Sequence, residues 1–150
     1  MVIDTAVAAI HLLFAGLWTG SVLFISYGVL PVALAGDVNA GPIETITGKL
    51  TTVSRASAVV LLLTGGHMAA QGYTVDSLTG SGRGHLVLAM LVLWFVLAAL
   101  VEIGASRLTD GASQAKVREP AREARRLFQV ASLVAVLLLV DGGLLATGFS

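Results

Sequence analysis

Four long apolar stretches limit what this chain of 150 residues can fold into. Each is long enough to cross the hydrocarbon core of a bilayer as a helix, which needs about 20 residues. Only 12% of the residues are charged, against about 25% in an average soluble domain. The sequence therefore predicts an all-α fold, a four-transmembrane-helix bundle in which residues 1–150 form one integral membrane domain. The predicted spans are roughly 5–30, 53–72, 85–105 and 127–149.

The basic residues are divided unevenly between the two ends of the predicted bundle. Only Arg83 lies in the loop between the second and third spans, and eight basic residues lie in or beside the other two loops. The positive-inside rule places those two loops in the cytoplasm. We therefore predict a multi-pass protein of the plasma membrane with both termini outside. The eight residues are Lys49, Arg55, Arg107, Lys116, Arg118, Arg122, Arg125 and Arg126.

Prolines mark the predicted ends and starts of helices. We expect Pro31 to close the first span, and Pro120 to begin a helix that runs directly into the fourth span, with its arginines as interfacial anchors. A short amphipathic cytoplasmic helix is predicted before the second span, from Pro42 to Val53, either on the membrane surface or under the bundle. Its apolar face consists of Ile43, Ile46, Leu50 and Val53.

All three histidines and one acidic residue fall in the outer layer of this predicted bundle. His11 is expected roughly 9 Å from the outer edge and His67 roughly 7–8 Å from it, by residue count. His85 begins the third span at that edge, and Asp141 lies in the outer half of the fourth. Polar groups in hydrocarbon are costly and usually face the bundle interior, so we expect His11, His67 and Asp141 to point inward.

Two imidazoles at one depth on neighbouring helices can share a metal ion. We predict that His11 and His67 face each other, with Gly65 and Gly66 leaving space for a bound guest. The candidate cofactors are haem b or copper, since imidazole ligates both, and zinc would suit the same atoms. The wider set of candidate metal ligands is His11, His67, His85 and Asp141. The chain has no cysteine, which excludes thiolate sites.

Structural explanations for the same residues stay open. His11 could hydrogen-bond Asp141 or a backbone carbonyl, and the small residues of "TGG" at 64–66 could serve only helix packing. Gly16 and Gly20 form a GxxxG pattern with the same two interpretations. We expect Glu102 to pair with Arg107 or to reach towards the membrane surface.

Two segments resemble the CopD-like and HemJ-like families of four-helix integral membrane proteins. "HLLFAGLWTGSVLF", from His11, resembles their first helix, which has a histidine followed by Trp and Gly, here Trp18 and Gly20. "GKLTTVSRASAVVLLLTGG" resembles their second helix. The third helix of these families starts near a lysine, where this chain has His85, and the Asn-Glu-x-Pro motif of their last helix is replaced around "LFQVASL".

The resemblance implies several functions. A HemJ-like protein would bind haem through His11 and take part in protoporphyrinogen oxidation, although the missing lysine and Asn-Glu-x-Pro motif argue against that activity. A CopD-like protein would take part in copper uptake or resistance, with the metal handled near the outer face. The histidine site itself would serve electron transfer or copper handling. A non-redox accessory subunit of a membrane complex is the third alternative. The expected partners are the lipid bilayer, a redox partner or complex subunits, and a second copy of the chain; the zero net charge gives no argument for nucleic acid.

Overall fold

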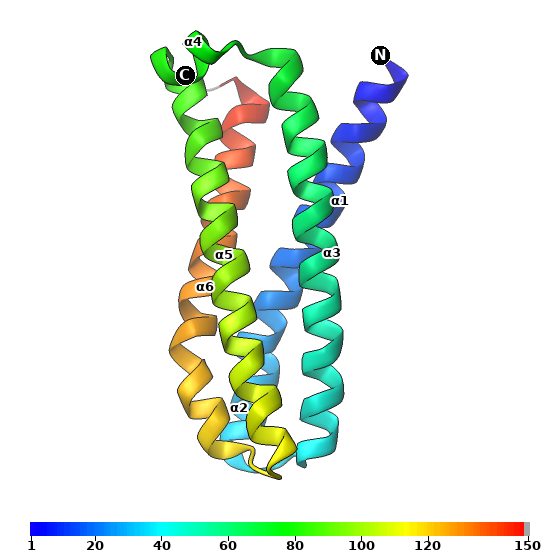
Figure 1. Cartoon of the computed structure of the whole chain (residues 1–150), viewed down its shortest axis with the longest axis vertical. Coiled ribbons are helices and arrows are strands. Elements are labelled where there is room, and N and C mark those ends of the chain that lie inside the picture. The colour runs from blue at the N-terminus through cyan, green and yellow to red at the C-terminus, as the bar shows by residue number, and fades with distance from the viewer. Residues whose placement is uncertain (149–150) are drawn as a thin grey trace.

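The computed structural model describes residues 1–148, and within that range the chain is helical with no strand. Four rods dominate the molecule (Figure 1), and each is long and apolar enough to cross a membrane. This confirms the predicted four-transmembrane-helix bundle. The helical segments are α1 (Val2–Phe24), η1 (Ile25–Val29), α2 (Leu30–Ala35), α3 (Ala40–Gly72), α4 (Val75–Gly80), α5 (Gly82–Ser113) and α6 (Arg118–Thr147).

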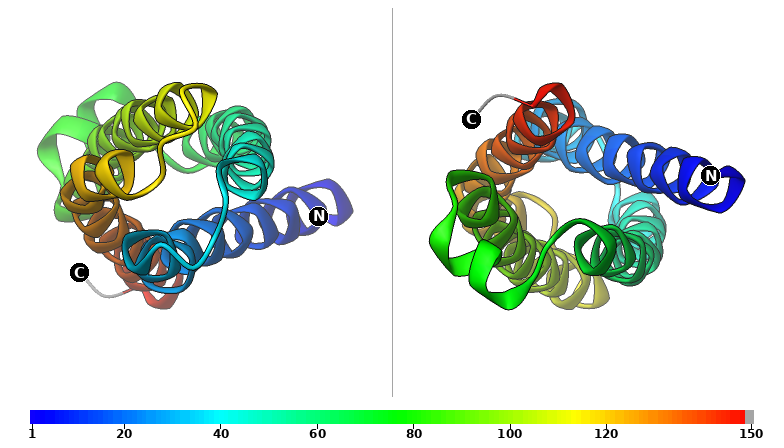
Figure 2. Two further views of the ribbon diagram at one scale, coloured as in Figure 1. Left: turned by 90° about the horizontal axis from the view of Figure 1, so that it is seen from below. Right: turned by 90° about the horizontal axis from the view of Figure 1, so that it is seen from above.

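The four rods stand in a ring, in the order α1, α3, α5, α6 (Figure 2). The N-terminus, α4 and the end of α6 lie at one end of the ring, which we call the termini end (Figure 1). The connections at 36–39 and 114–117 lie at the other end, which we call the loop end. Neighbouring rods run antiparallel, so the histidines at 11, 67 and 85 all belong to the termini end. Which end faces the cytoplasm stays a prediction.

The first rod does not stop at Pro31, and that expectation was wrong. The helix passes through a π-helical turn, Ile25–Val29, and continues as α2 to Ala35. Proline has no N–H to donate, and its ring clashes with the carbonyl four residues earlier in a regular α-helix. The wider π turn directly before Pro31 changes the backbone spacing, so the chain accommodates the ring without ending. Gly36, with a φ of 78°, then terminates the helix in the left-handed conformation.

The amphipathic segment from Pro42 to Val53 is helical as predicted, but it is not a separate surface helix. It forms the first turns of α3, a continuous helix of 33 residues and therefore about 50 Å long. Ile43 and Leu50 are buried against the other rods. The predicted apolar face thus packs inside the bundle, and α3 extends well beyond the roughly 30 Å of a hydrocarbon core.

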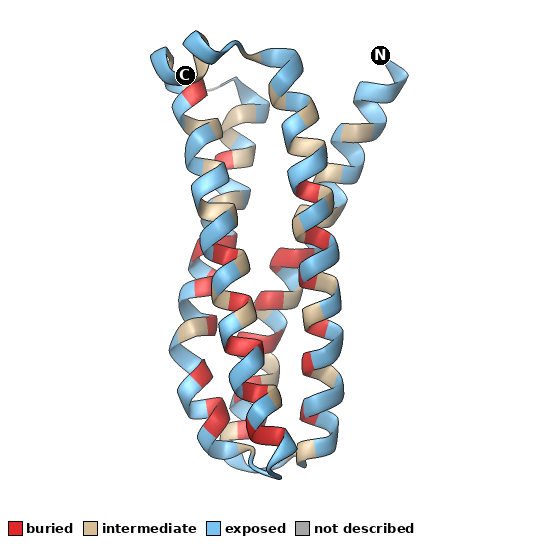
Figure 3. Cartoon of the chain, in the orientation of Figure 1, coloured by how far each residue is buried: buried red, intermediate tan, exposed pale blue. Residues whose placement is uncertain are grey.

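Close packing between the four rods is concentrated in the loop-end half of the bundle (Figure 3). On α5 and α6 the backbones approach so closely that a Cβ at Gly104 would lie 2.8 Å from Cε2 of Phe128, and one at Gly111 would overlap the ring of Pro120. By contrast, Gly16 and Gly20 have no neighbouring atom within 4 Å of an added Cβ. The GxxxG pattern therefore packs against nothing in residues 1–148.

The termini-end half is loosely packed. Before Trp18 no residue of α1 is buried, and after Leu61 none of α3 is buried. The first turns of α1 diverge from the other rods (Figure 1). Within the described part of α6, Asp141 is the single buried residue beyond Ala135. The predicted histidine layer therefore belongs to the open half of the molecule.

Candidate metal centre

A row of polar contacts joins α1 to α3. One face of α1 carries three residues of this row at intervals of seven, or about two helical turns: Asp4, His11 and Trp18. Their partners on α3 run in the opposite direction: His67 at 3.4 Å from Asp4, Thr64 at 2.7 Å from His11, and Ser54 at 2.8 Å from Trp18. We call these three contacts the polar seam. It fixes the register of the two antiparallel helices.

The contact of His11 with Thr64 defines the protonation of the imidazole ring. The Thr64 hydroxyl lies 2.7 Å from Nδ1 of His11 and 2.7 Å from the carbonyl oxygen of Val60. A hydroxyl has a single proton, and a carbonyl can only accept. Both contacts are therefore hydrogen bonds only if Thr64 donates to Val60 and His11 Nδ1–H donates to Thr64. In that tautomer Nε2 of His11 carries the free lone pair.

Gly65 allows the His11 ring to lie directly against α3. A methyl group at this position would be 3.2 Å from Cε1 of His11, which is tighter than an ordinary van der Waals contact. An added Cβ at Gly66 would meet no atom within 4 Å. The two glycines therefore differ: Gly65 accommodates the histidine itself, and Gly66 borders open space.

His67 lies one turn nearer the termini end than Thr64. Its Nε2 is 3.4 Å from a carboxylate oxygen of Asp4 and 3.1 Å from Nε2 of Gln71, and its side chain is 39% exposed. His11 contacts Thr64, and His67 lies three residues further along α3, so the two histidines differ in depth by about 4.5 Å. The difference in depth predicted from residue count was about 2 Å. Both imidazoles lie on the polar seam.

The other two candidate ligands lie elsewhere. Nε2 of His85 contacts the carbonyl oxygen of Thr79 at 2.8 Å, which ties α5 to the short helix α4. Asp141 is only 6% exposed on α6, and neither carboxylate oxygen has a hydrogen-bond partner. Among residues 1–148, no three His, Asp or Glu side chains are close enough to hold one metal ion. His11 and His67 therefore remain the candidate pair of metal ligands.

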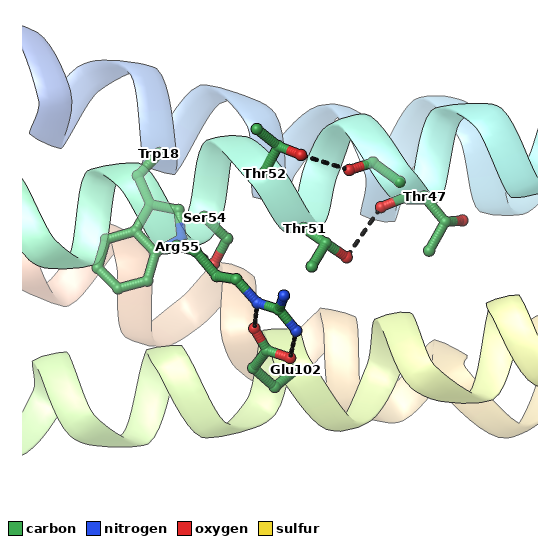
Figure 4. A network of polar contacts seen from close by, with 8 residues as sticks. Trp18, Thr47, Thr51, Thr52, Ser54, Arg55 and Glu102 are labelled. Atoms are coloured by element: carbon green, nitrogen blue, oxygen red, sulfur yellow. Dashed lines mark hydrogen bonds and ion pairs between the residues drawn. The ribbon is translucent and has the colours of Figure 1, made fainter.

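An ion pair that the sequence did not predict joins α3 to α5. Arg55 donates from Nε and Nη2 to the two oxygens of Glu102, at 2.7 and 3.1 Å (Figure 4). The expected pairing of Glu102 with Arg107 was wrong, since Arg107 instead lies 3.6 Å from Glu123 on α6. An ion pair between residues four or five positions apart on one helix can be predicted from sequence. An ion pair between two helices depends on how the helices are aligned.

Fold and hydropathy together define a multi-pass membrane protein with four helices long enough to span. The family model described as copper resistance protein D, CopD, matches residues 44–146, which is more than half of the chain. The chain therefore belongs to the CopD family. The matched region contains His67, His85 and Asp141 and leaves out α1 with His11. Neither the curated proteins nor the solved structures compared with the chain contain a match.

Proposed function

We propose that this chain handles copper at the termini end of the bundle, and that His11 and His67 bind the ion there. The observation that carries the proposal is the polar seam, on which both imidazoles lie in the open half of the molecule. Membership of the CopD family supports copper as the metal. With both termini outside, as the basic residues predict, the site would receive copper from the outer face.

The hydrogen bonds around His11 suit it for ligation. A metal-bound histidine usually donates its other ring N–H to an oxygen, which fixes the tautomer and orients the ring. Thr64 would supply that oxygen for His11, and Nε2 would hold the copper. The nearby carboxylate of Asp4 would offset part of the ion's charge. Imidazole nitrogens are good ligands for copper.

The same contacts favour a bare ion over haem. A porphyrin bound to Nε2 of His11 needs a broad slot beside the ring, and the His11 ring already packs on α3 at Gly65. A macrocycle could not lie between α1 and α3 at Gly65 without displacing this ring. This contact also weighs against protoporphyrinogen oxidation.

The test is copper binding by the purified protein in detergent, measured by competition with a chromogenic chelator. His11→Ala and His67→Ala should each weaken binding by more than about 100-fold, because even the loss of an outer-shell partner typically costs about 10- to 100-fold. Thr64→Val, which keeps the side-chain shape, should weaken binding by about 10- to 100-fold for that reason. His85→Ala is the matched control, since it removes an imidazole from the same end of the bundle.

Three results would overturn the proposal. The first is a folded wild-type protein that binds no copper, and the second is an equal loss of binding in the His85→Ala control. The third is a Soret band of stoichiometric intensity in protein expressed with haem available. Helix content and elution volume confirm that each variant is folded before its binding is compared.

A further inference from the structure

Three arginines form a stripe along the first turns of α6. Arg122, Arg125 and Arg126 are all exposed. Their spacings of three and four residues place them within one face of the helix. In the described residues 1–148, none of the three guanidinium groups forms an ion pair with an acidic side chain. We call these residues the arginine stripe.

Two other arginines at the loop end have partners inside the protein. Arg118 donates from Nη2 to the carbonyl oxygen of Ala35 at 2.9 Å, which ties α6 to the end of α2. Arg107 lies 3.6 Å from Glu123. This acidic residue, which lies beside Arg122, therefore already has an ion-pair partner. The arginine stripe therefore stands apart as positive charge with no structural task in the fold.

The same face of α6 becomes apolar about two turns further along. Leu133, Val136 and Val140 continue the spacing from Arg122 and Arg126 in steps of three, four or seven residues. They are 60%, 41% and 53% exposed in the chain alone. A helix face of this kind points to lipid. Its acyl-chain part begins about 10 Å, or seven residues, above Arg126, which puts the stripe at the depth of the head groups.

The rod formed by η1 and α2, which also contacts α6, indicates the same depth in the membrane. The bond from Arg118 to Ala35 sets the register of the two antiparallel rods. Eight residues further into the bundle, this register brings Arg126 to about the level of Tyr27. Tyr27 belongs to the π turn, and its side chain is 64% exposed. Exposed tyrosines are typical of the interfacial layer. An aromatic ring and the arginine stripe thus mark one level of the membrane boundary.

We propose that the arginine stripe binds the phosphate groups of anionic phospholipids, whose acyl chains lie along Leu133, Val136 and Val140. A guanidinium presents a planar fork of donors that matches phosphate oxygens. The apolar continuation of the same face distinguishes a lipid from a free phosphate ion, since only a lipid occupies both parts. With the predicted orientation, the lipid belongs to the cytoplasmic leaflet. This inference is independent of copper binding.

The test compares phospholipids on the whole protein in detergent. Wild-type protein is titrated with phosphatidylglycerol and with phosphatidylcholine, and bound lipids are counted by native mass spectrometry. The stripe variant carries Arg122→Gln, Arg125→Gln and Arg126→Gln. A control removes positive charges from the same end with Lys49→Gln and Lys116→Gln, and it keeps Arg107, which is paired with Glu123. Both variants change exposed or half-exposed side chains, so neither should unfold the bundle.

We expect wild type to prefer phosphatidylglycerol, and the stripe variant to bind it on the order of 100-fold more weakly, as three interfacial charges imply. The control should keep most of the preference. Equal losses in the two variants would show general charge attraction and overturn the proposal. It would also be overturned if wild type did not distinguish the two lipids, or if inorganic phosphate at millimolar concentration displaced the bound lipid completely.

Discussion

The two halves of the bundle are built on different principles. In the loop-end half, glycines and alanines let α5 and α6 approach closely, and large side chains such as Phe128 and Leu108 are fully enclosed. In the termini-end half α1 diverges from the other rods (Figure 3), and its contacts with α3 there are polar: Asp4 with His67, and His11 with Thr64. The difference suggests that one half stabilises the fold and the other is available for a ligand.

Trp18 and Trp94 mark the boundary between the halves. Trp18 donates to Ser54, and Trp94 donates to the carbonyl oxygen of Ala58 at 3.0 Å. The two indoles therefore connect α1 and α5 to adjacent turns of α3. The Arg55–Glu102 pair lies at nearly the same level on α3. This belt holds three rods together where the close packing ends, on the loop-end side of the histidines.

The largest expected contrast is between two phenylalanines. Phe128→Ala removes a side chain with no exposed surface, packed against Gly104, and should lower the free energy of unfolding by about 3–5 kcal/mol. Phe14→Ala, at a half-exposed position of α1, should cost clearly less. Denaturant titrations in one detergent measure both values. Equal losses would show that the termini-end half is packed as tightly as the loop-end half.

A smaller contrast uses the glycine at the tightest approach of α5 and α6. Gly111→Ala would place a methyl group inside the ring of Pro120, and neither the proline ring nor the backbone can rotate away. Overpacking of this kind typically costs about 1–3 kcal/mol. Gly48→Ala is the control, because an added Cβ there meets no atom within 4 Å. A stable Gly111→Ala variant would contradict the close contact.

Substitution of Asp141 should raise the free energy of unfolding, whereas the substitutions of Phe128 and Gly111 should lower it. The Asp141 carboxylate is buried with neither oxygen hydrogen-bonded, and an unsatisfied buried group of this kind costs about 1–3 kcal/mol, more when charged. Asp141→Asn keeps the shape and removes the charge, so the free energy of unfolding should rise by about 1 kcal/mol. Copper binding at the polar seam should stay unchanged. A loss of copper binding would instead make Asp141 a ligand, as the sequence suggested.

Much of the fold was predictable because hydropathy depends on single segments. The four spans, the helicity of 42–53 and the helix that runs through Pro120 into the fourth span follow from local patterns, and the structure confirms them. That last helix begins at Arg118, two residues before the predicted start at Pro120. The pairings were not predictable: Arg55 with Glu102, and His11 with Thr64, depend on the register between rods. Pro31 was misjudged because a π turn, which leaves no sequence signal that we recognise, absorbs the ring.

The smallest predicted effect separates the two glycines beside His67. Gly66→Ala meets no neighbour, and alanine is the better helix former, so the free energy of unfolding should rise by about 0.5 kcal/mol with copper binding unchanged. Gly65→Ala would press on Cε1 of His11 at 3.2 Å and should weaken copper binding by tilting the ring away from its bond with Thr64. Chelator competition and denaturant titration on both variants make the comparison. If Gly66→Ala were the one that abolished copper binding, the ligand would occupy the open space beside Gly66 and not the contact between His11 and α3.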